Sequence, residues 1–507
     1  MTSRRDSLSY LLLMPVLASA PPAMGQTQSG HPSTTPPTYR TQPGTGELPP
    51  RHPPPAGPDA RLRLAYWNEV GLSALARDTT PPFPGQAPTP AEQAGPTRAT
   101  RVMAIVQLAV YEALNAIGKR YPAYGAPLSA FADSSPDAAI AQAAHDTLAA
   151  LLPRQARWFG MWLGADLARL PAGRSLLNGI DIGRRAAASI LALRSTDGSD
   201  HKEPVVGEEY IASQQPGQWR PDPVSRNPVA LGAWWGRVKP FVLQSASQYR
   251  IPPVAALTSP DYTRAFDEVK RIGADGLNTP TGRTREQTII GIFWGYDGSA
   301  WLGPRPRQYN QIAVQLALAG SADPLELARV LALVNVAMAD AAIAAWESKY
   351  YYRLWRPVTG VREASPGNSP TGLGDGNRNT VGDPGWTPLG APASNLTGPN
   401  FTPPFPSCPS GHATLGSAMF QVLRRLYGDA ISFTLVSDEL NGITRDSGGR
   451  VRPYIPRSFS SLSQAEEENG RSRIYLGVHW DFDMMEGFTM GRQIGDYVIQ
   501  RGLVQQT

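Results

Sequence analysis

Residues Pro406–Gly416 read P-S-C-P-S-G-H-A-T-L-G, and the rest of the chain is best interpreted outward from this stretch. Its second proline ends any helix upstream, and apolar residues recur at helical spacing after His412. Ser410 and Gly411 are therefore expected at a helix N-terminus, where free backbone N–H groups and the helix dipole favour an anion. His412 can titrate near neutral pH. Taken alone, the stretch also fits a serine-capped helix with a surface histidine.

A second stretch, Lys349–Pro357, reads K-Y-Y-Y-R-L-W-R-P. Lys349 and Arg356 are seven positions apart, which on one continuous helix places them about 20° apart on the same face. Pro357 is expected to end that helix after Arg356. A compact ammonium and a forked guanidinium suit one multiply charged oxyanion. A solvated basic face beside an aromatic cluster is the alternative.

A third stretch, Ser472–Asp483, reads S-R-I-Y-L-G-V-H-W-D-F-D. Arg473 and His479 cannot share one helical face, because six positions correspond to about 240°. Gly477 between them suggests that Arg473 precedes a helix start at His479. The Asp483 carboxylate, four positions on, can reach one ring nitrogen of His479 and fix its tautomer. A partly buried, purely structural His–Asp pair remains the alternative.

The three motifs K-x6-R-P, P-S-G-H and S-R-x5-H-x3-D occur in this order. Together they resemble the superfamily that joins vanadium-dependent haloperoxidases and phosphatidic-acid-phosphatase type 2 acid phosphatases. Phe293–Gly298, followed by Tyr309–Gln311, resembles the segment upstream of the first motif in the fungal chloroperoxidase type. Trp346 and Phe405 resemble the halide-pocket aromatics of that type. Thr100–Ile117 resembles an early helix of bacterial members.

This resemblance implies vanadate as the prosthetic group, and phosphate, which has the same tetrahedral shape, fits the same site. The implied vanadate-binding residues are Lys349, Arg356, Ser410, Gly411, Arg473 and His479. The implied catalytic residues are His412 as acid/base, His479 as the vanadium ligand, Lys349 as the group that polarises peroxide and Asp297 as the brace of the arginines. The implied reaction oxidises chloride or bromide with hydrogen peroxide to hypohalous acid or a halogenated small organic acceptor. Trp346 and Phe405 favour the chloride-using subtype.

The same residues also fit an exported soluble acid phosphatase of that superfamily. His479 would then attack phosphorus to form a phosphohistidine, and His412 would protonate the leaving group. No oxyanion ligand separates the two enzymes, but the segment around Asp297 and the pair Trp346 and Phe405 lean toward the peroxidase. A helical protein that only binds an oxyanion is a third hypothesis, against which the intact motifs weigh.

The 507-residue chain has a formal net charge of +5, and its basic residues are dispersed, so no run typical of nucleic-acid binding is present. Apolar residues recur at three and four through most of the chain after residue 61, which predicts an all-α fold of two helical bundles packed as one globular unit with long irregular loops. The expected regions are an N-terminal helical region (61–250) and a C-terminal catalytic region (251–507). The expected helices are Arg98–Ile117, Ala138–Leu152, Gln155–Leu170, Arg174–Leu193, Tyr262–Ile272, Arg285–Phe293, Gln308–Leu318, Pro324–Tyr351, Ala413–Tyr427 and Asp481–Arg501.

Residues 1–25 read as an export signal, which predicts a periplasmic or secreted protein, and residues 26–60 read as a Pro-rich, flexible linker. A disordered or membrane-anchoring N-terminus is the alternative. Pro324–Trp346 is very apolar but carries charged residues, so we expect a core helix there and no integral membrane segment. Gly367–Pro404 and Glu439–Gly470 are expected to be long irregular loops. The single cysteine, Cys408, excludes an intrachain disulfide, and the oligomeric state is left open, a homodimer included.

Overall fold

The computed structural model describes residues 52–79, 91–299, 302–390, 402–443 and 451–503, all of which lie in one compact unit, residues 38–507. The predicted export signal and most of the predicted linker lie outside the described residues. Within the described residues the chain forms thirteen α-helices and only short strands, so the predicted all-α class is confirmed. The boundary expected near residue 250 stays a prediction.

The helices agree with the predicted ranges to within about three residues wherever a helix was expected. They are α1 (Ala60–Asp78), α2 (Gly95–Gly118), α3 (Pro136–Leu151), α4 (Ala156–Leu167), α5 (Arg174–Arg194), α6 (Pro260–Ile272), α7 (Arg285–Phe293), α8 (Pro306–Gly320), α9 (Pro324–Tyr352), α10 (Pro357–Glu363), α11 (Gly411–Tyr427), α12 (Leu462–Tyr475) and α13 (Asp481–Arg501). The antiparallel strand pairs are β1 (Asp297–Ser299) with β2 (Gly303–Pro304), and β3 (Phe433–Leu435) with β4 (Arg457–Phe459).

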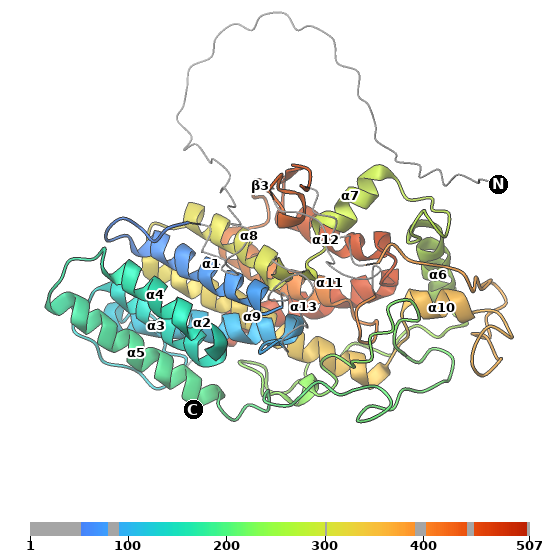
Figure 1. The fold of residues 1–507 in the computed structure, drawn as a ribbon, viewed down its shortest axis with the longest axis horizontal. Helices are drawn as coiled ribbons and strands as arrows, with labels where there is room; N and C mark the ends of the chain where they lie inside the picture. The colour runs from blue at the N-terminus through green and yellow to red at the C-terminus, as the bar shows by residue number, and fades with distance from the viewer. Residues whose placement is uncertain (1–51, 80–90, 300–301, 391–401, 444–450, 504–507) are drawn as a thin grey trace, which may run out of the picture. The chain divides into compact units, whose positions relative to one another are not determined.

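Helix α9 is the central helix of the fold, as predicted. Helix α2 packs along α9 on one side and is itself covered by α3 and α5, and α11 packs against α9 on the other (Figure 1). Helices α2 and α9 are long and apolar enough to cross a membrane, yet 89% and 94% of their most apolar windows are buried inside the structure. A helix that is apolar on all sides and covered by other helices is an interior helix.

Helices α11 and α13 pack unusually closely because α13 presents a glycine at every fourth position. A Cβ atom at Gly487 would lie 2.7 Å from the Cβ atom of Ala413 and 2.9 Å from the carbonyl oxygen of Ser410. Gly491 and Gly495 meet the next turns of α11 in the same way. The backbones of the two helices therefore touch without intervening side chains, beside the turn that starts α11.

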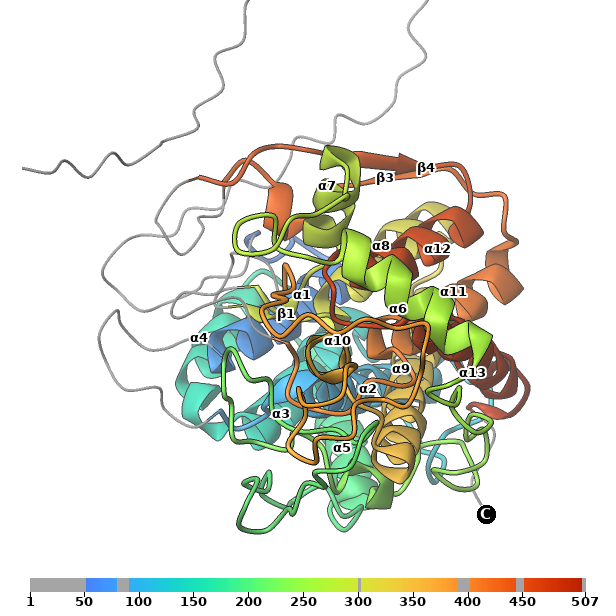
Figure 2. The same cartoon turned by 90° about the vertical axis from the view of Figure 1, so that its right-hand side faces the viewer.

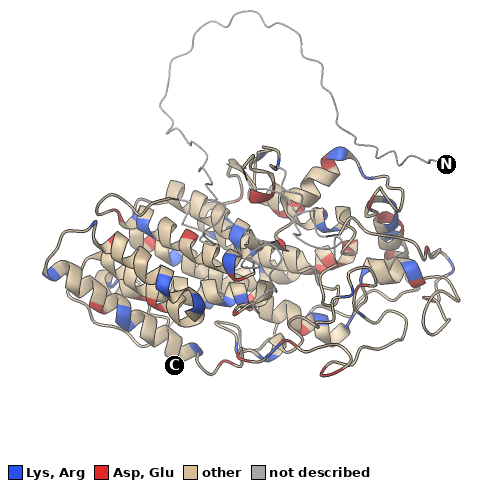
Figure 3. Ribbon diagram, viewed as in Figure 1, with Lys and Arg blue, Asp and Glu red and all other residues tan. Residues whose placement is uncertain are grey.

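The expectation of a loop over Glu439–Gly470 was wrong in part, because β4 and the first nine residues of α12 lie in this range. The β3–β4 ribbon lies beside α7, where the rings of Phe293 and Phe459 approach to 6.5 Å between centroids (Figure 2). Helix α12 is rich in charged and polar residues and lacks a clear apolar stripe. Ion pairs hold it instead, including Arg457 with Glu468 at 2.7 Å. Lys and Arg residues are spread over many elements rather than gathered on one helix (Figure 3).

Candidate oxyanion site

The turn that begins α11 has the structure expected from its sequence. Ser410 is the N-cap of the helix, and its hydroxyl accepts a weak hydrogen bond of 3.4 Å from the amide of Ala413. Its own amide donates to the carbonyl of Asp483, which fixes the turn against the start of α13. The first-turn amides, including that of Gly411, lack intrahelical acceptors and can bind an anion. The alternative of a surface histidine is excluded, because His412 is buried.

His479 is held at both ring nitrogens, and its partners fix its tautomer. Nδ1 lies 2.7 Å from Oδ2 of Asp483, whereas Nε2 lies 2.9 Å from Nη1 of Arg356. A guanidinium can only donate, so Nε2 carries the lone pair and Nδ1 carries the proton. Burial, followed by the charges of Arg356 and Lys349, holds the pKa of His479 well below its usual range. The imidazole is therefore neutral, with a nucleophilic nitrogen among the cations of the site.

Asp483 fixes the ring of His479, as the spacing predicted. Its Oδ2 atom also accepts from the Trp480 amide at 3.1 Å and from the Ser407 hydroxyl. Burial is the main cause that raises the pKa of Asp483 to about 6. At neutral pH this carboxylate is the negative partner that orients His479 from the side opposite Arg356.

His412 points its Nε2 atom at two backbone carbonyls, those of Trp294 at 3.0 Å and Gly295 at 2.8 Å. Nε2 therefore donates, which leaves Nδ1 as the acceptor of the ring. The carbonyl of His412 accepts from the Tyr309 hydroxyl and the Asn469 side-chain amide, both at 3.0 Å. These contacts lock the residue between α8 and α12 and leave Nδ1 to take or give a proton.

The histidine environment gives a pH prediction. Burial first, and then the charges of Arg305 and Arg473, lower the pKa of His412 well below 6.5. The folded chain then binds fewer protons than the unfolded chain as pH falls below about 6.5, so this group removes stability on acidification. Between pH 7 and 5.5, wild type is expected to lose about 1 kcal/mol more unfolding free energy than His412→Gln. Urea unfolding at each pH measures this difference in unfolding free energy. The same pH dependence of stability in the two proteins would contradict the prediction.

Arg473 and Arg356 come from different elements, and the charges of both act on His479. Arg473 lies on the last turn of α12 and pairs with Asp297 at 2.8 Å, the brace that was expected, and Arg305 pairs with the same carboxylate at 3.2 Å. Arg356 instead donates to the carbonyls of Phe405 at 2.9 Å and Val478 at 2.8 Å. Asp297 therefore braces one of the two arginines assigned from sequence, together with one that the sequence analysis did not single out.

The expectation that Lys349 and Arg356 share one helix was wrong. Helix α9 ends at Tyr352, and Arg353 takes a left-handed conformation with φ of 55° that turns the chain. Arg356 is the N-cap of α10, with Pro357 at the first helical position. The two cations still converge, because the chain reverses between them rather than continuing as a helix.

The Lys349 ammonium is buried and occupied by backbone carbonyls. It donates to Pro406 at 3.1 Å, to Ser407 at 2.6 Å and to Pro409. A lysine has three N–H groups, so these contacts use all of them. In this structure Lys349 ties the 406–409 loop to α9, and its charge rather than a free N–H faces the site.

Buried guanidinium N–H groups provide the fit test for an oxyanion. Among the described residues, the Nη2 atom of Arg356 and the Nε and Nη1 atoms of Arg473 are buried without a hydrogen-bond partner. Unpaired buried donors of this kind are costly, and charged ones more so. A tetrahedral oxyanion supplies the missing acceptors, so the residues present fit vanadate or phosphate.

The two aromatics assigned to the halide pocket are in contact. The rings of Trp346 and Phe405 lie 4.8 Å apart between centroids, and the Arg356 guanidinium lies 4.9 Å from the centroid of Phe405. A cavity of about 60 Å³ is lined by Phe405, Asp297 and Arg305, among others.

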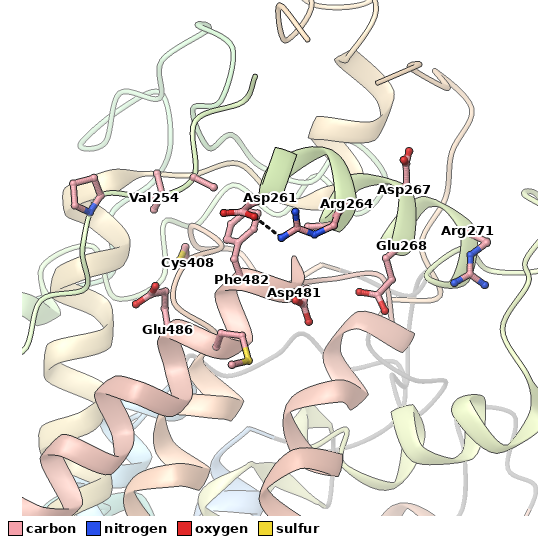
Figure 4. A pocket seen from close by; sticks show the side chains of 14 residues that line it. Val254, Asp261, Arg264, Asp267, Glu268, Arg271, Cys408, Asp481, Phe482 and Glu486 are labelled. Carbon is pink, nitrogen blue, oxygen red and sulfur yellow. Dashed lines mark hydrogen bonds and ion pairs between the residues drawn. The ribbon is translucent and has the colours of Figure 1, made fainter. Parts of the chain in front are cut away.

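A larger cavity, of about 800 Å³, lies behind the 406–409 loop. Cys408 and Phe482 contribute to its wall, and acidic residues of α6 and α13 line much of the remainder (Figure 4). Several of these carboxylates are neutralised, as Asp261 is by Arg264. Lys349, Arg356 and Arg473 do not line this cavity, whereas Arg305 lines the smaller one.

Comparison with known proteins agrees with this geometry. Residues 329–505, which carry all three motifs, match the family described as the VCPO second helical-bundle domain. The match covers less than half of the chain.

The chain is also similar to a curated protein, the vanadium chloroperoxidase of Curvularia inaequalis, with 38% identity over 284 residues. The match covers 48% of this chain and 44% of that relative, so it spans less than half of the relative's length.

Solved structures show that the likeness in fold extends beyond residues 329–505. The first bacterial vanadium-dependent iodoperoxidase aligns with a TM-score of 0.67 and 22% identity, over 88% of this chain and 98% of that one. A holo-type bacterial vanadium-dependent chloroperoxidase aligns with a TM-score of 0.58 and 18% identity, over 82% and 94%. At these identities the likeness establishes the fold.

Proposed function

We propose that this protein is a vanadate-dependent haloperoxidase that oxidises chloride or bromide with hydrogen peroxide. The observation that carries the proposal is a neutral His479, its Nε2 lone pair directed among arginines that hold unpartnered N–H groups. The VCPO second-domain match over the same residues supports it. Export and homodimer formation stay predictions.

The residues divide the work according to their contacts. His479 would ligate vanadium through Nε2, and the free N–H groups of Arg356 and Arg473, with the Ser410 hydroxyl and the Gly411 amide, would hold the oxygens. Vanadate, when bound, supplies an electrophilic centre that activates peroxide for two-electron oxidation of a halide. The surrounding cations stabilise the negative charge that develops on the departing oxygen. His412 would move protons at Nδ1, the ring atom that its backbone contacts leave free.

The size of the smaller cavity bears on the organic acceptor. About 60 Å³ holds a halide or a peroxide, whereas pockets for drug-sized ligands measure roughly 300 Å³ or more. We therefore expect hypohalous acid to leave the site and to halogenate the organic acceptor outside this cavity. The contact between Trp346 and Phe405 supports chloride as a substrate through the resemblance noted above.

The test is a halogenation assay on the purified chain before and after loading with orthovanadate. Peroxide-dependent halogenation of a dione dye is expected only after loading, with bromide and also with chloride. Hydrolysis of a phosphate ester by the unloaded protein is measured in parallel. Ester hydrolysis without halogenation by any halide would reassign the chain to the acid phosphatases, and bromide activity without chloride activity would overturn the inference from Trp346 and Phe405.

A further inference from the structure

Arg305 is a buried cation that neither the motifs nor the comparisons assign to any role. It lies between β2 and the start of α8, with only 3% of its surface exposed. Its Nη2 atom pairs with Asp297 at 3.2 Å. Its Nε and Nη1 atoms are buried and have no hydrogen-bond partner among the described residues.

The unpartnered edge of Arg305 faces the anion-binding turn. Its Nη1 atom lies 2.9 Å from the position that a Cβ atom on Gly411 would occupy. Two kinds of donor thus meet there without an acceptor between them, the guanidinium and the first-turn amides of α11. The positive end of a helix dipole repels a guanidinium, so an anion between them would stabilise this arrangement.

The charge balance leads to the same conclusion. Arg305 and Arg473 share the single carboxylate of Asp297. One carboxylate cannot neutralise two buried guanidinium groups, and a buried charge without a counter-charge is strongly unfavourable. Arg307, two positions further on, is also buried but has two carboxylate partners of its own, Glu69 at 2.8 Å and Asp438 at 2.7 Å.

Lys349 provides the contrast within the site. All three of its N–H groups are taken by backbone carbonyls, as described above. Arg305, by comparison, has two nitrogens without a partner among the described residues, Nε and Nη1, and it lines the smaller cavity. The direct hydrogen bonds from this side of the site are therefore available from the arginine and not from the lysine.

We propose that Arg305 binds the oxyanion directly, donating from Nε or Nη1 beside the Gly411 amide, while Asp297 anchors its other nitrogen. The proposal rests on the oxyanion site of the proposed function. It makes Arg305 part of the vanadate- and phosphate-binding set, and Asp297 the residue that positions Arg305 and Arg473 together.

The test measures oxyanion binding without catalysis. Orthovanadate and inorganic phosphate are titrated separately into the purified full chain by equilibrium dialysis, with bound vanadium and phosphorus counted directly. Arg305→Gln is expected to weaken the binding of both anions by about 10- to 100-fold, the loss typical of a charge-assisted hydrogen bond. Arg305→Lys keeps the charge but loses the forked guanidinium, so its oxyanion affinity is expected to lie between those of wild type and Arg305→Gln.

Arg307→Lys is the matched control, since it changes a buried arginine in the same turn that has its own carboxylates. Its oxyanion affinity is expected to stay within about twofold of wild type. Thermal melting establishes which variants fold. If Arg305→Gln does not fold, the oxyanion affinity of Arg305→Lys decides the question. Wild-type affinity in a folded Arg305 variant would overturn the proposal.

The outcomes separate this inference from the proposed function. Loss of oxyanion affinity in the Arg305 variants, in a protein that halogenates nothing, would support the binding role and overturn only the haloperoxidase assignment. Absence of oxyanion binding by the wild-type chain would overturn both.

Discussion

Replacing His479 with alanine is expected to abolish peroxide-dependent halogenation, with a loss of about 10³-fold or more in kcat. The change removes the ring nitrogen whose lone pair faces Arg356, and it leaves Nη1 of Arg356 without that acceptor. The measurement combines kcat of the vanadate-loaded enzyme with the amount of vanadium retained after dialysis. Both quantities should fall.

Asp483→Asn is the graded control for this substitution. The side chain still accepts from Nδ1 of His479, which lies 2.7 Å away, but it no longer carries the charge that orients and polarises the ring. A loss of roughly 10- to 100-fold is expected, as is typical of residues that support a metal ligand. Full halogenation activity in His479→Ala would remove this histidine, and with it the present site, from the mechanism.

Asp340→Ala is expected to lower the free energy of unfolding by about 3–5 kcal/mol. Asp340 lies on α9, and its carboxylate accepts hydrogen bonds from three consecutive backbone amides, those of Phe241, Val242 and Leu243, at 2.6–2.9 Å. Alanine would leave these buried donors without an acceptor. The shift of the urea midpoint, converted with the wild-type slope, measures the loss.

Asp340→Asn is the matched control, because it has the same shape and keeps one acceptor oxygen. A smaller loss of about 1–2 kcal/mol is expected for it. Equal midpoints for Asp340→Ala and wild type would show that the 241–243 segment does not depend on this carboxylate. Oxyanion affinity measured well below the melting temperature should be unchanged, since Asp340 contacts none of the site residues.

Most helices with a regular apolar period were predicted from sequence, whereas α1, α10 and α12 were not. The ranges of α7 and α13 were predicted to the residue. Helix α12, L-S-Q-A-E-E-E-N-G-R-S-R-I-Y, has few apolar residues, and its partners Arg457 and Arg492 lie elsewhere in the chain. Its helical state depends on tertiary ion pairs, which a local pattern does not reveal.

Within the site, the pair His479 and Asp483 was predictable because both residues lie on one local segment. The relation of Lys349 to Arg356 was not, because a single left-handed residue, Arg353, replaces the assumed helix with a turn. Arg305 was missed for a different reason. Its sequence context, G-P-R-P-R, resembles an ordinary surface turn, and its role depends on the carboxylate of Asp297 and on a helix that starts more than a hundred residues later.

The close contact of α11 with α13 has a consequence for selectivity. The turn at Ser410 and the segment bearing His479 are attached to these two helices, and the glycines of α13 allow the backbones to touch. The distance between the Ser410 turn and the His479 segment thus depends on how closely the backbones of α11 and α13 pack. The residues at this helix contact do not touch the ligand. A methyl group at Gly487 would force the Ser410 carbonyl outward and increase the distance between the Ser410 turn and the His479 segment. All the charged residues of the site would still be present. Discrimination between tetrahedral ions of different radius could therefore be adjusted from a helix interface, independently of the chemistry of the binding side chains.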